Sequence, residues 1–362
     1  MAYYIGMDVS QRQTSICVVD DDSKIIAEGK ALTLPSDIYD WLKNRIETQQ
    51  IHMAGIEAGA MSNWLCMELS KLGLPIICLE SFQAHQFLKT QRNKTDKNDA
   101  RGLAQMVRMG GAFIKSVNIR SEGNQSTRML LTVRQNLVRL KLSLENNITG
   151  SLKPFGLIVP RSNACAKKFR ERVIIALHQA EERGIKIQAS MMPSLNLYDI
   201  LCGQLFLLNK QVEALAKSCP ICRRLMTVPG VGSIIALSFV TSVDNPHRFK
   251  KSGDIGAYFG LTPRQYQSGE MDIRGGTSRR GDVMTRTHLV QAATVLLFKT
   301  KKWCALKAWG MKIAKRHGMV KARIAVARKL ATILHKMWIT QKDFCWSASV
   351  SADTLLAGTK PA

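Results

Sequence analysis

Short apolar segments, separated by polar turns, open the chain. Three of them are β-rich and follow one another closely: Tyr3–Ser10, Gln13–Asp20 and Ser23–Leu32. Segments of this length, joined by short turns, predict an antiparallel meander of three strands. The apolar positions then change to a helical period, so the first hundred residues are expected to form a mixed α/β module.

After the meander, helix and strand signals alternate. Ser36 is expected to cap a helix that runs to about Gln49 with its apolar residues on one face. The further elements are expected in the order strand, helix, strand, helix: His52–Gly59, about Ser62–Leu72, Pro75–Glu80, and the segment carrying Asp96 and Asp99. The order β-β-β-α-β-α-β-α is that of the RNase H-like (RuvC-like) nuclease and transposase fold.

The middle of the chain is expected to be helical. Apolar residues recur at steps of three and four over Leu130–Ile148 and again over Leu201–Leu215, and Pro154 breaks the first stripe. Such stripes predict either a helical hairpin packed on its own domain or a coiled-coil arm that dimerises. The polar and basic segment between them, Val159–Ser194, predicts no particular element.

The last third of the chain combines a turn motif with basic helices. Leu225–Thr241 has the apolar-Pro-Gly-apolar-Gly pattern of a helix-hairpin-helix. There Gly230 and Gly232 would let backbone N–H groups approach a phosphate, although a tight turn between two packed helices explains the same pattern. Lys307–Lys342 is expected to form a pair of basic amphipathic helices. The Ser-, Ala- and Thr-rich final ~15 residues are expected to be disordered.

Charge changes this picture by indicating a polyanionic partner. The 362 residues carry a formal net charge of +25. The first hundred have 10 Lys and Arg against 13 Asp and Glu, whereas the remainder has 42 against 14, a net charge of +28. A strongly basic body favours nucleic acid as the partner. No apolar run approaches the ~20 residues needed to span a bilayer, so no membrane partner is expected.

The cysteines and the N-terminus indicate a reducing compartment. The nine cysteines are irregularly spaced, and no signal peptide pattern precedes the first strand. Free thiols in the cytoplasm are therefore expected. The one local pair, Cys219 and Cys222, lacks the second pair that a zinc site requires.

Four carboxylates are candidates for a metal site. Asp96 and Asp99 are three residues apart, which places both on one face of a helix. Asp8 lies in the first strand and Glu57 ends the fourth, and these strands are neighbours in the expected sheet. Hard oxygen ligands of this kind hold Mg²⁺, which activates an attacking oxygen and stabilises a leaving one.

Cations surround the two aspartates. The basic residues of this stretch are expected to contact phosphates beside the metal site: Arg92, Lys94, Lys97 and Arg101. The alternative is that the carboxylates are turn residues at strand ends and ordinary surface charge on a helix.

Three blocks that contain these carboxylates resemble a known family. "IGMDVS", "GIEAG" and "NKTDKNDA" are similar to the three DEDD blocks of the insertion-sequence-110 transposases, a family that includes the Piv-type DNA invertases. The resemblance covers about Tyr3–Phe155. It implies that the four carboxylates are catalytic ligands of Mg²⁺, with Mn²⁺ as a substitute.

A second resemblance covers about Ile221–Ala308. The segment Tyr258–Ala293 combines Gly-rich turns with five arginines: Arg264, Arg274, Arg279, Arg280 and Arg286. Its Gly-Leu-x-Pro, Ser-Gly and Gly-Asp elements resemble the second conserved block of the same family, although Glu270 stands where that family commonly has a small residue. The resemblance implies that Ser268 is a nucleophile on DNA, with Ser278 as the competing serine. The arginines are expected to bind nucleic acid and stabilise a phosphoryl group in transfer.

Together these resemblances imply a DNA transposase or site-specific recombinase. It would act through a covalent phosphoserine link on donor and target DNA, guided by a bridge RNA, as a homo-oligomer (a dimer, with a tetramer in the synaptic complex) in a bacterial-type cytoplasm near the nucleoid. The expected domains are a nuclease domain (1–120), a coiled-coil arm (121–218), a transposase domain (219–310) and basic helices with a tail (311–362). The alternatives are a Holliday-junction resolvase-like nuclease that uses the carboxylates alone, and a non-catalytic nucleic-acid-binding protein.

Overall fold

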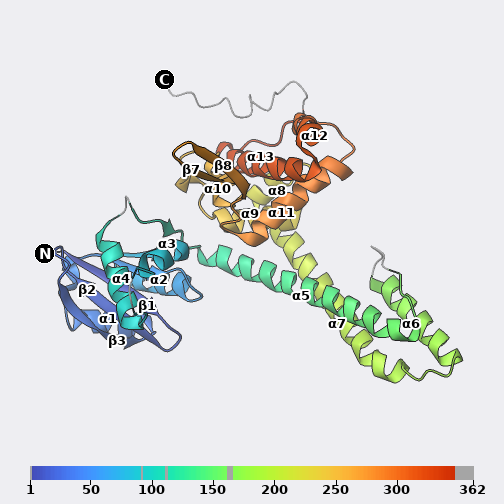
Figure 1. Cartoon of the computed structure of the whole chain (residues 1–362), viewed down its shortest axis with the longest axis horizontal. Coiled ribbons are helices and arrows are strands. Elements are labelled where there is room, and N and C mark those ends of the chain that lie inside the picture. The colour runs from blue at the N-terminus through green and yellow to red at the C-terminus, as the bar shows by residue number, and fades with distance from the viewer. Residues whose placement is uncertain (1, 91–92, 111–112, 161–165, 347–362) are drawn as a thin grey trace. The chain divides into compact units, whose positions relative to one another are not determined.

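The computed structural model describes residues 2–90, 93–110, 113–160 and 166–346. The chain divides into two compact units, Met1–Arg120 and Ser121–Ala362, and each is described by itself. Figure 1 shows their elements. Arg92 and the predicted disordered tail both lie outside the described residues.

The N-terminal unit is built on one mixed sheet, ordered β3-β2-β1-β4-β5-β6. β1, β2 and β3 form the predicted antiparallel meander, and β1 and β4 are parallel neighbours, as expected. A short edge strand, β6, was not predicted and pairs antiparallel with β5. The strands are β1 (Tyr3–Val9), β2 (Gln13–Val19), β3 (Ile25–Leu32), β4 (Ile51–Glu57), β5 (Ile76–Leu79) and β6 (Ser116–Val117).

Helices cover both faces of this sheet. On one face the buried side chains of β1, such as Ile5 and Met7, pack against α1 (Pro35–Lys43) and α2 (Ser62–Lys71). On the other face lie α4 (Asp96–Arg108) and, beside it, α3 (Ser81–Leu88), which was not predicted. Alternation of side chains along each strand explains why both faces are apolar.

The first helix differs from its prediction at both ends. Ser36 does not cap it, because Pro35 already occupies the first turn and Leu34 is the N-cap; the Ser36 hydroxyl bonds Asp37 Oδ1 instead at 3.1 Å. Proline suits this position because its φ is helical and its missing N–H would be unpaired there. The helix ends at Lys43, and a 3₁₀ turn, η1 (Thr48–Gln50), follows.

α4 lies directly on the sheet because two glycines face it. Gly6 of β1 and Gly55 of β4 are paired across the parallel ladder. A Cβ added to Gly6 would lie 2.1 Å from the backbone N of Ala104, and one added to Gly55 would lie 2.4 Å from Val107 Cγ2. The helix backbone at Gly6 and the Val107 side chain at Gly55 thus occupy the space that larger side chains would need.

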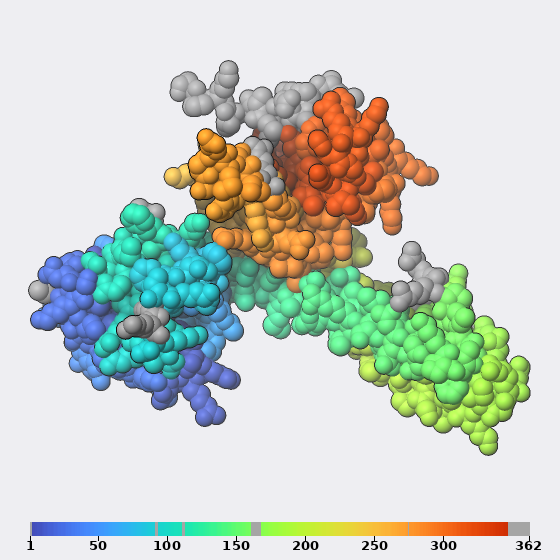
Figure 2. Space-filling model, in the orientation of Figure 1, coloured from blue at the N-terminus to red at the C-terminus, as the bar shows by residue number. Residues whose placement is uncertain are grey.

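The C-terminal unit begins with a helical arm. α5 (Glu122–Leu152) packs along α7 (Gln188–Ser218), and α6 (Ala166–Glu182) completes a small core at its far end, around Leu177 and Tyr198. In the space-filling view the arm extends away from the rest of this unit (Figure 2). α6 and the start of α7 occupy the segment that predicted no element. The arm is a helical hairpin, and its role in dimerisation stays a prediction.

Most residues of the predicted apolar stripes are buried or half-buried, such as Ile148 and Val212, but parts of the apolar surface of the arm are exposed. Leu140 of the first stripe is 55% exposed, and Phe206, which lies off the second stripe, is 58% exposed. Among the described helices, α7 is the one that meets the length and mean hydropathy (1.2) of a membrane span, which is a weak indication because core helices of soluble proteins can meet the same criteria.

The rest of this unit is a helical core with one β-hairpin, β7 (Pro263–Ser268) and β8 (Met271–Thr277). α12 and α13 correspond to the predicted basic helix pair, and large buried side chains such as Phe239 and Phe259 fill the centre. The helices are α8 (Pro220–Leu225), α9 (Ser233–Val243), α10 (Asp254–Tyr258), α11 (Val283–Thr294), α12 (Ala305–His317) and α13 (Met319–Thr340), with the π-helical turn Val295–Lys299 after α11 and 3₁₀ turns at Lys153–Phe155 and Pro246–Arg248.

A buried ion pair joins the arm to this core. Arg128 of α5 contacts Asp282, which caps α11 through the backbone N–H of Thr285 at 3.0 Å. Burial alone would raise the pKa of Asp282, but Arg128 and the hydrogen bonds to its carboxylate lower it instead. A carboxylate paired in this way fixes the start of α11 relative to α5.

The contact between α4 and the sheet predicts that a methyl group added at Gly6 destabilises the N-terminal unit more than one added elsewhere in the sheet. Gly6→Ala should lower the free energy of unfolding of the N-terminal unit by about 1–3 kcal/mol, the usual cost of overpacking. Gly29→Ala is the matched control in the same sheet, because its Cβ would meet only the Trp41 ring at 3.0 Å. Urea denaturation of both variants measures the difference. Equal losses in the two would contradict the close packing of α4.

Candidate active site

Asp8 and Glu57 project from the sheet toward α4. Along β1, Ile5 and Met7 face α1 and α2, so the alternate positions Gly6 and Asp8 face α4. Along β4, Ile56 faces the α1 and α2 side, and Glu57 therefore lies on the α4 side like Gly55. The two carboxylates, expected on neighbouring strands, therefore lie on the same face of the sheet.

The other two carboxylates lie in the first turn of α4. Thr95 is its N-cap, and its side chain accepts a hydrogen bond from the backbone N–H of Asn98 at 3.2 Å. Asp96 and Asp99 follow directly, where the positive end of the helix dipole favours negative charge. Because α4 is already against Gly6 at Ala100 and Ala104, its first turn lies near the end of β1.

The pKa values show that the four carboxylates interact. Burial, followed by the negative charges of Asp99, Asp96 and Glu57, raises the pKa of Asp8 to about 6, against a smaller opposing effect of Lys94. Burial also raises the pKa of Glu57, with Asp99 acting in the same direction. Mutual repulsion of this kind is relieved by a cation, and carboxylate oxygens are the donors that Mg²⁺ prefers.

The carboxylates are not drawn together as a finished ligand set. Within the described ranges, no group of three or more His, Cys, Asp or Glu side chains is arranged to hold a metal ion. Asp96 is exposed and pairs with Lys30 at 3.4 Å. The donor set has the right chemistry, but the side chains would have to move to bring their oxygens around one ion, and Asp96 would have to leave Lys30.

The predicted phosphate contacts around α4 have different surroundings. Lys97 and Arg101 both bind Glu28 of β3, at 2.5 and 2.9 Å, and this pairing lowers the pKa of Glu28. Lys94 is exposed and close enough to lower the pKa of Asp8 and Glu57. Of these cations, Lys94 is therefore the one that faces the carboxylates.

A cleft of about 500 Å³ opens at this site, lined by Asp8, Glu57 and the turn after β4. It includes Gln11 and Ser62, which sequence reasoning did not single out. His85 was missed as well: it lies on the unpredicted helix α3, and its charge lowers the pKa of Glu57. Nothing in the sequence around His85 distinguishes it from a surface residue, since only the fold brings α3 beside β4.

Ser268 is at the tip of the β7–β8 hairpin. It ends β7 opposite Met271, and all residues of β7 are exposed. Gly269 has a φ of 57°, while Glu270 keeps a negative φ, the pattern of a two-residue turn with glycine first. Glu270 is therefore compatible with the turn. Ser278, the competing serine, is half-buried and its backbone N–H bonds Thr262 O at 2.8 Å.

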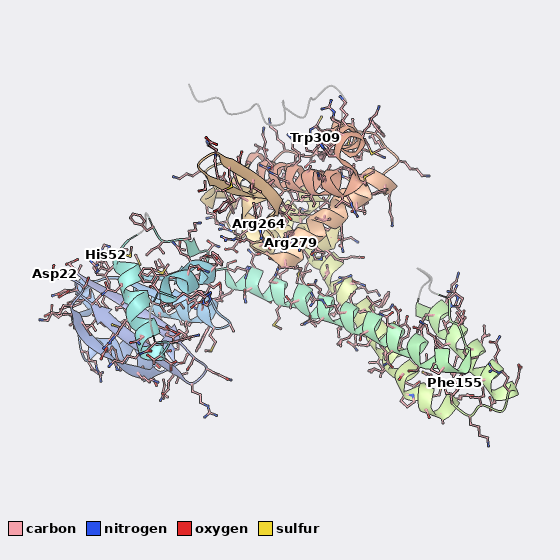
Figure 3. The ribbon with its side chains drawn as sticks, viewed as in Figure 1. Asp22, His52, Phe155, Arg264, Arg279 and Trp309 are labelled. Atoms are coloured by element: carbon pink, nitrogen blue, oxygen red, sulfur yellow. The ribbon has the colours of Figure 1, made fainter. Side chains whose placement is uncertain are left out.

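The five arginines near the hairpin separate into different environments. Arg264 on β7 and Arg279 in the turn before α11 are exposed, and both are labelled in Figure 3. Arg280 is exposed and has an interaction partner. Arg286 bonds the backbone carbonyls of Phe259 and Arg280 at 3.1 and 2.7 Å, so it holds the turn together. The backbone of Arg274 lies in β8, and its side chain is outside the described residues.

The two glycines of the helix-hairpin-helix pattern also differ. Gly230 has a φ of 87°, and a Cβ there would lie 2.5 Å from the backbone O of Ala292, so this glycine serves the tight turn against α11. Gly232 is the N-cap of α9, and a Cβ there would meet no atom within 4 Å. Gly230 thus fits the tight-turn interpretation, whereas Gly232 leaves the N-terminus of α9 open and the phosphate contact stays a prediction.

Comparison with known proteins agrees with this arrangement. A DEDD transposase model of IS110 elements matches residues 5–155, and the model described as "Transposase IS116/IS110/IS902 family" matches residues 222–308. The transposase for insertion sequence element IS1111A of Coxiella burnetii is 28% identical over 350 residues, covering 94% of this chain and 90% of that protein. The transposase for insertion sequence element IS1328 of Yersinia enterocolitica is 27% identical, covering 78% and 82%.

The two matched regions and these relatives define the chain as an insertion-sequence transposase. It belongs to the IS116/IS110/IS902 family. The predicted family is confirmed by both matched regions.

Burial of Asp8 and repulsion from its neighbouring carboxylates predict that Asp8→Asn stabilises the metal-free protein. The raised pKa of Asp8 means that its contribution to stability is present below about pH 4 and is lost as the pH rises through about 6. In EDTA at pH 7.5 the variant should gain about 1 kcal/mol, less than the pKa shift alone implies because solvent screens a half-exposed carboxylate.

Thermal unfolding with and without Mg²⁺ checks this prediction. Mg²⁺ should stabilise the unsubstituted protein more than Asp8→Asn. Asp22→Asn, at an exposed aspartate labelled in Figure 3, is the control and should change neither the stability in EDTA nor the effect of Mg²⁺. An Asp8→Asn protein that is no more stable in EDTA and responds normally to Mg²⁺ would show that the carboxylates do not form one site.

Proposed function

We propose that this transposase cuts and exchanges DNA strands with Mg²⁺ held by Asp8, Glu57, Asp96 and Asp99, and with Ser268 as the nucleophile. The observation that carries the proposal is that Asp8 and Glu57 lie on the sheet face covered by α4, whose first turn carries Asp96 and Asp99 near enough to raise the pKa of Asp8. The strand order of that sheet supports an RNase H-like assignment for the N-terminal unit. The exposure of the Ser268 hairpin supports its access to DNA.

The residues of the chain divide the work between them. When bound, Mg²⁺ would supply Lewis-acid stabilisation of charge on the phosphoryl oxygens. Ser268 Oγ forms a bond to phosphorus while the bond from phosphorus to the leaving deoxyribose oxygen breaks. The proton that the serine hydroxyl loses balances the one that the deoxyribose oxygen takes up, so one ester bond replaces another in the protein–DNA link. Arg264 and Arg279, both exposed beside the hairpin, stabilise the negative charge of the transferring group. Lys94 orients the phosphate at the carboxylates.

The partners extend this proposal. A net charge of +28 beyond residue 100 suits the binding of donor DNA, target DNA and a guiding bridge RNA together. Two DNA duplexes require four strand cuts, so the working form is an oligomer, with the exposed apolar residues of the arm as its contact surface. The place of action is the bacterial cytoplasm, at the nucleoid.

One observation favours a second candidate. The carboxylate site is contained in the N-terminal unit and needs no residue of the other unit for its four carboxylates. A resolvase-like nuclease that activates water would use this site alone. The two functions differ in whether the protein becomes covalently linked to DNA.

A cleavage assay on labelled donor DNA separates the candidates. Ser268→Ala should abolish the covalent adduct, seen as a shifted band on a denaturing gel, with a loss of more than about 100-fold. Ser278→Ala is the matched control and should keep the adduct. Cleavage that persists in Ser268→Ala without an adduct would identify the water-activating nuclease.

The same assay tests the carboxylates. Asp99→Asn should remove both cleavage and adduct, because the site loses one of its metal-binding charges. If Asp99→Asn retained full activity and activity did not depend on Mg²⁺, the carboxylates would have no catalytic role and the nucleic-acid-binding alternative would stand.

A further inference from the structure

A second polar cavity lies within the C-terminal unit, where the arm meets the helical core. It has a volume of about 670 Å³ and is lined by residues of α5, α7, α11 and the start of α9. We propose that this cavity binds a phosphate group of the nucleic-acid backbone. That the phosphate belongs to nucleic acid rests on the proposed function. That an anion binds in this cavity rests on the geometry described next.

The N-terminus of α9 opens into this cavity without a cap. Gly232 is its N-cap residue and supplies no side-chain hydrogen bond. The first intrahelical bond is from Ala236 N–H to Gly232 O, at 3.0 Å, so the N–H groups of Ser233, Ile234 and Ile235 precede it. Such N–H groups, together with the helix dipole, favour an anion. Because Gly232 has no side chain, nothing of its own covers them.

A buried histidine provides an independent indication of a ligand. His288 of α11 lines the cavity and is only 8% exposed, and its Nδ1 has no hydrogen-bond partner among the described residues. A buried polar atom of this kind normally has a partner. Burial and the charges of Arg134 and Arg128 lower the pKa of His288 to about 4, so the imidazole is neutral and can donate from Nδ1 to a phosphate oxygen.

Two arginines of the arm give the cavity its positive charge. Arg134 is held by a hydrogen bond from its Nε to Asn209 Oδ1 of α7, at 2.7 Å, and burial lowers its pKa. The described residues place no carboxylate within ion-pair distance of Arg134, and Arg139 lines the cavity beside it. Among the described lining residues the one carboxylate is Glu213, which is exposed. A desolvated guanidinium without a counter-ion favours an anionic ligand.

The site joins two parts of one unit. α5 and α7 supply Arg134, Arg139 and Asn209, whereas α9 and α11 supply the N–H groups and His288. A phosphate bound there would stabilise the arm against the core. Backbone N–H groups and guanidinium groups recognise phosphate without reading bases, so the contact would position nucleic acid without selecting its sequence.

Two substitutions at one residue test the proposal on the full chain. Gly232→Asp and Gly232→Asn should both cap α9, since Asp and Asn are about equally good N-caps, but only the aspartate places a negative charge at the phosphate position. Gly232→Asp should bind a mixed-sequence DNA duplex about tenfold more weakly than Gly232→Asn at low salt, with the slope of log affinity against log salt reduced by about one.

Controls separate this site from general charge. Gly123→Asp adds the same charge to α5 at a glycine with open space around it and should leave duplex affinity within about twofold. Arg134→Gln should weaken the duplex as Gly232→Asp does. Thermal unfolding with inorganic phosphate is measured on the same proteins, to learn whether a free anion occupies the cavity.

The outcomes are distinct. Equal duplex affinity and salt slope for Gly232→Asp and Gly232→Asn, with no stabilisation by inorganic phosphate, would overturn the site. Stabilisation by phosphate that Gly232→Asp removes, without a change in duplex affinity, would support an anion site and overturn nucleic acid as its source. The affinity for the duplex is measured without any strand cleavage. If the Ser268→Ala assay contradicted the proposed nucleophile, the test of the cavity would therefore still stand.

Discussion

Close packing of α4 against two strands is the contact on which the carboxylate site depends. Gly6 and Gly55 lie opposite each other on β1 and β4, and helix backbone and Val107 occupy the space above them. A helix satisfies its own backbone hydrogen bonds, so it can rest directly on a sheet at interior packing density. Its first turn is thereby held near Asp8 and Glu57 by the core of the unit, not by the loop that precedes it.

The negative charge gathered around Asp8 and Glu57 is unfavourable in the absence of a cation. Asp8 and Glu57 are half-buried, and burial together with repulsion from the carboxylates of α4 raises the pKa of Asp8 to about 6. The helix dipole and Lys94 offset part of this cost, and Lys30, Lys97 and Arg101 neutralise the outer side around Asp96 and Glu28. Raised carboxylate pKa values in a cleft are typical of functional sites. A divalent cation would convert the repulsion into attraction.

In the C-terminal unit, residues of the same type have different roles because packing separates them. Arg286 turns inward and bonds two backbone carbonyls, whereas Arg264 and Arg279 remain exposed beside Ser268. Arg128 is committed to Asp282, while Arg134, less than two turns further along α5, meets no carboxylate and faces a cavity. Gly230 makes a turn, and Gly232 leaves a helix end open. The basic composition is therefore divided between structural ion pairs and surfaces available to nucleic acid.

The sequence by itself determined the chain order of the first five strands, the neighbouring strands that carry Asp8 and Glu57, the shared helical turn of Asp96 and Asp99, and the family. These features are local: side-chain alternation, helical spacing and turn residues record them in neighbouring positions. It did not determine the helix α3 with His85, the pairing of Lys97 with Glu28, the inward position of Arg286, or the cavity beside His288. Each of those joins residues far apart in the chain, so only the packing of one element on another could decide them.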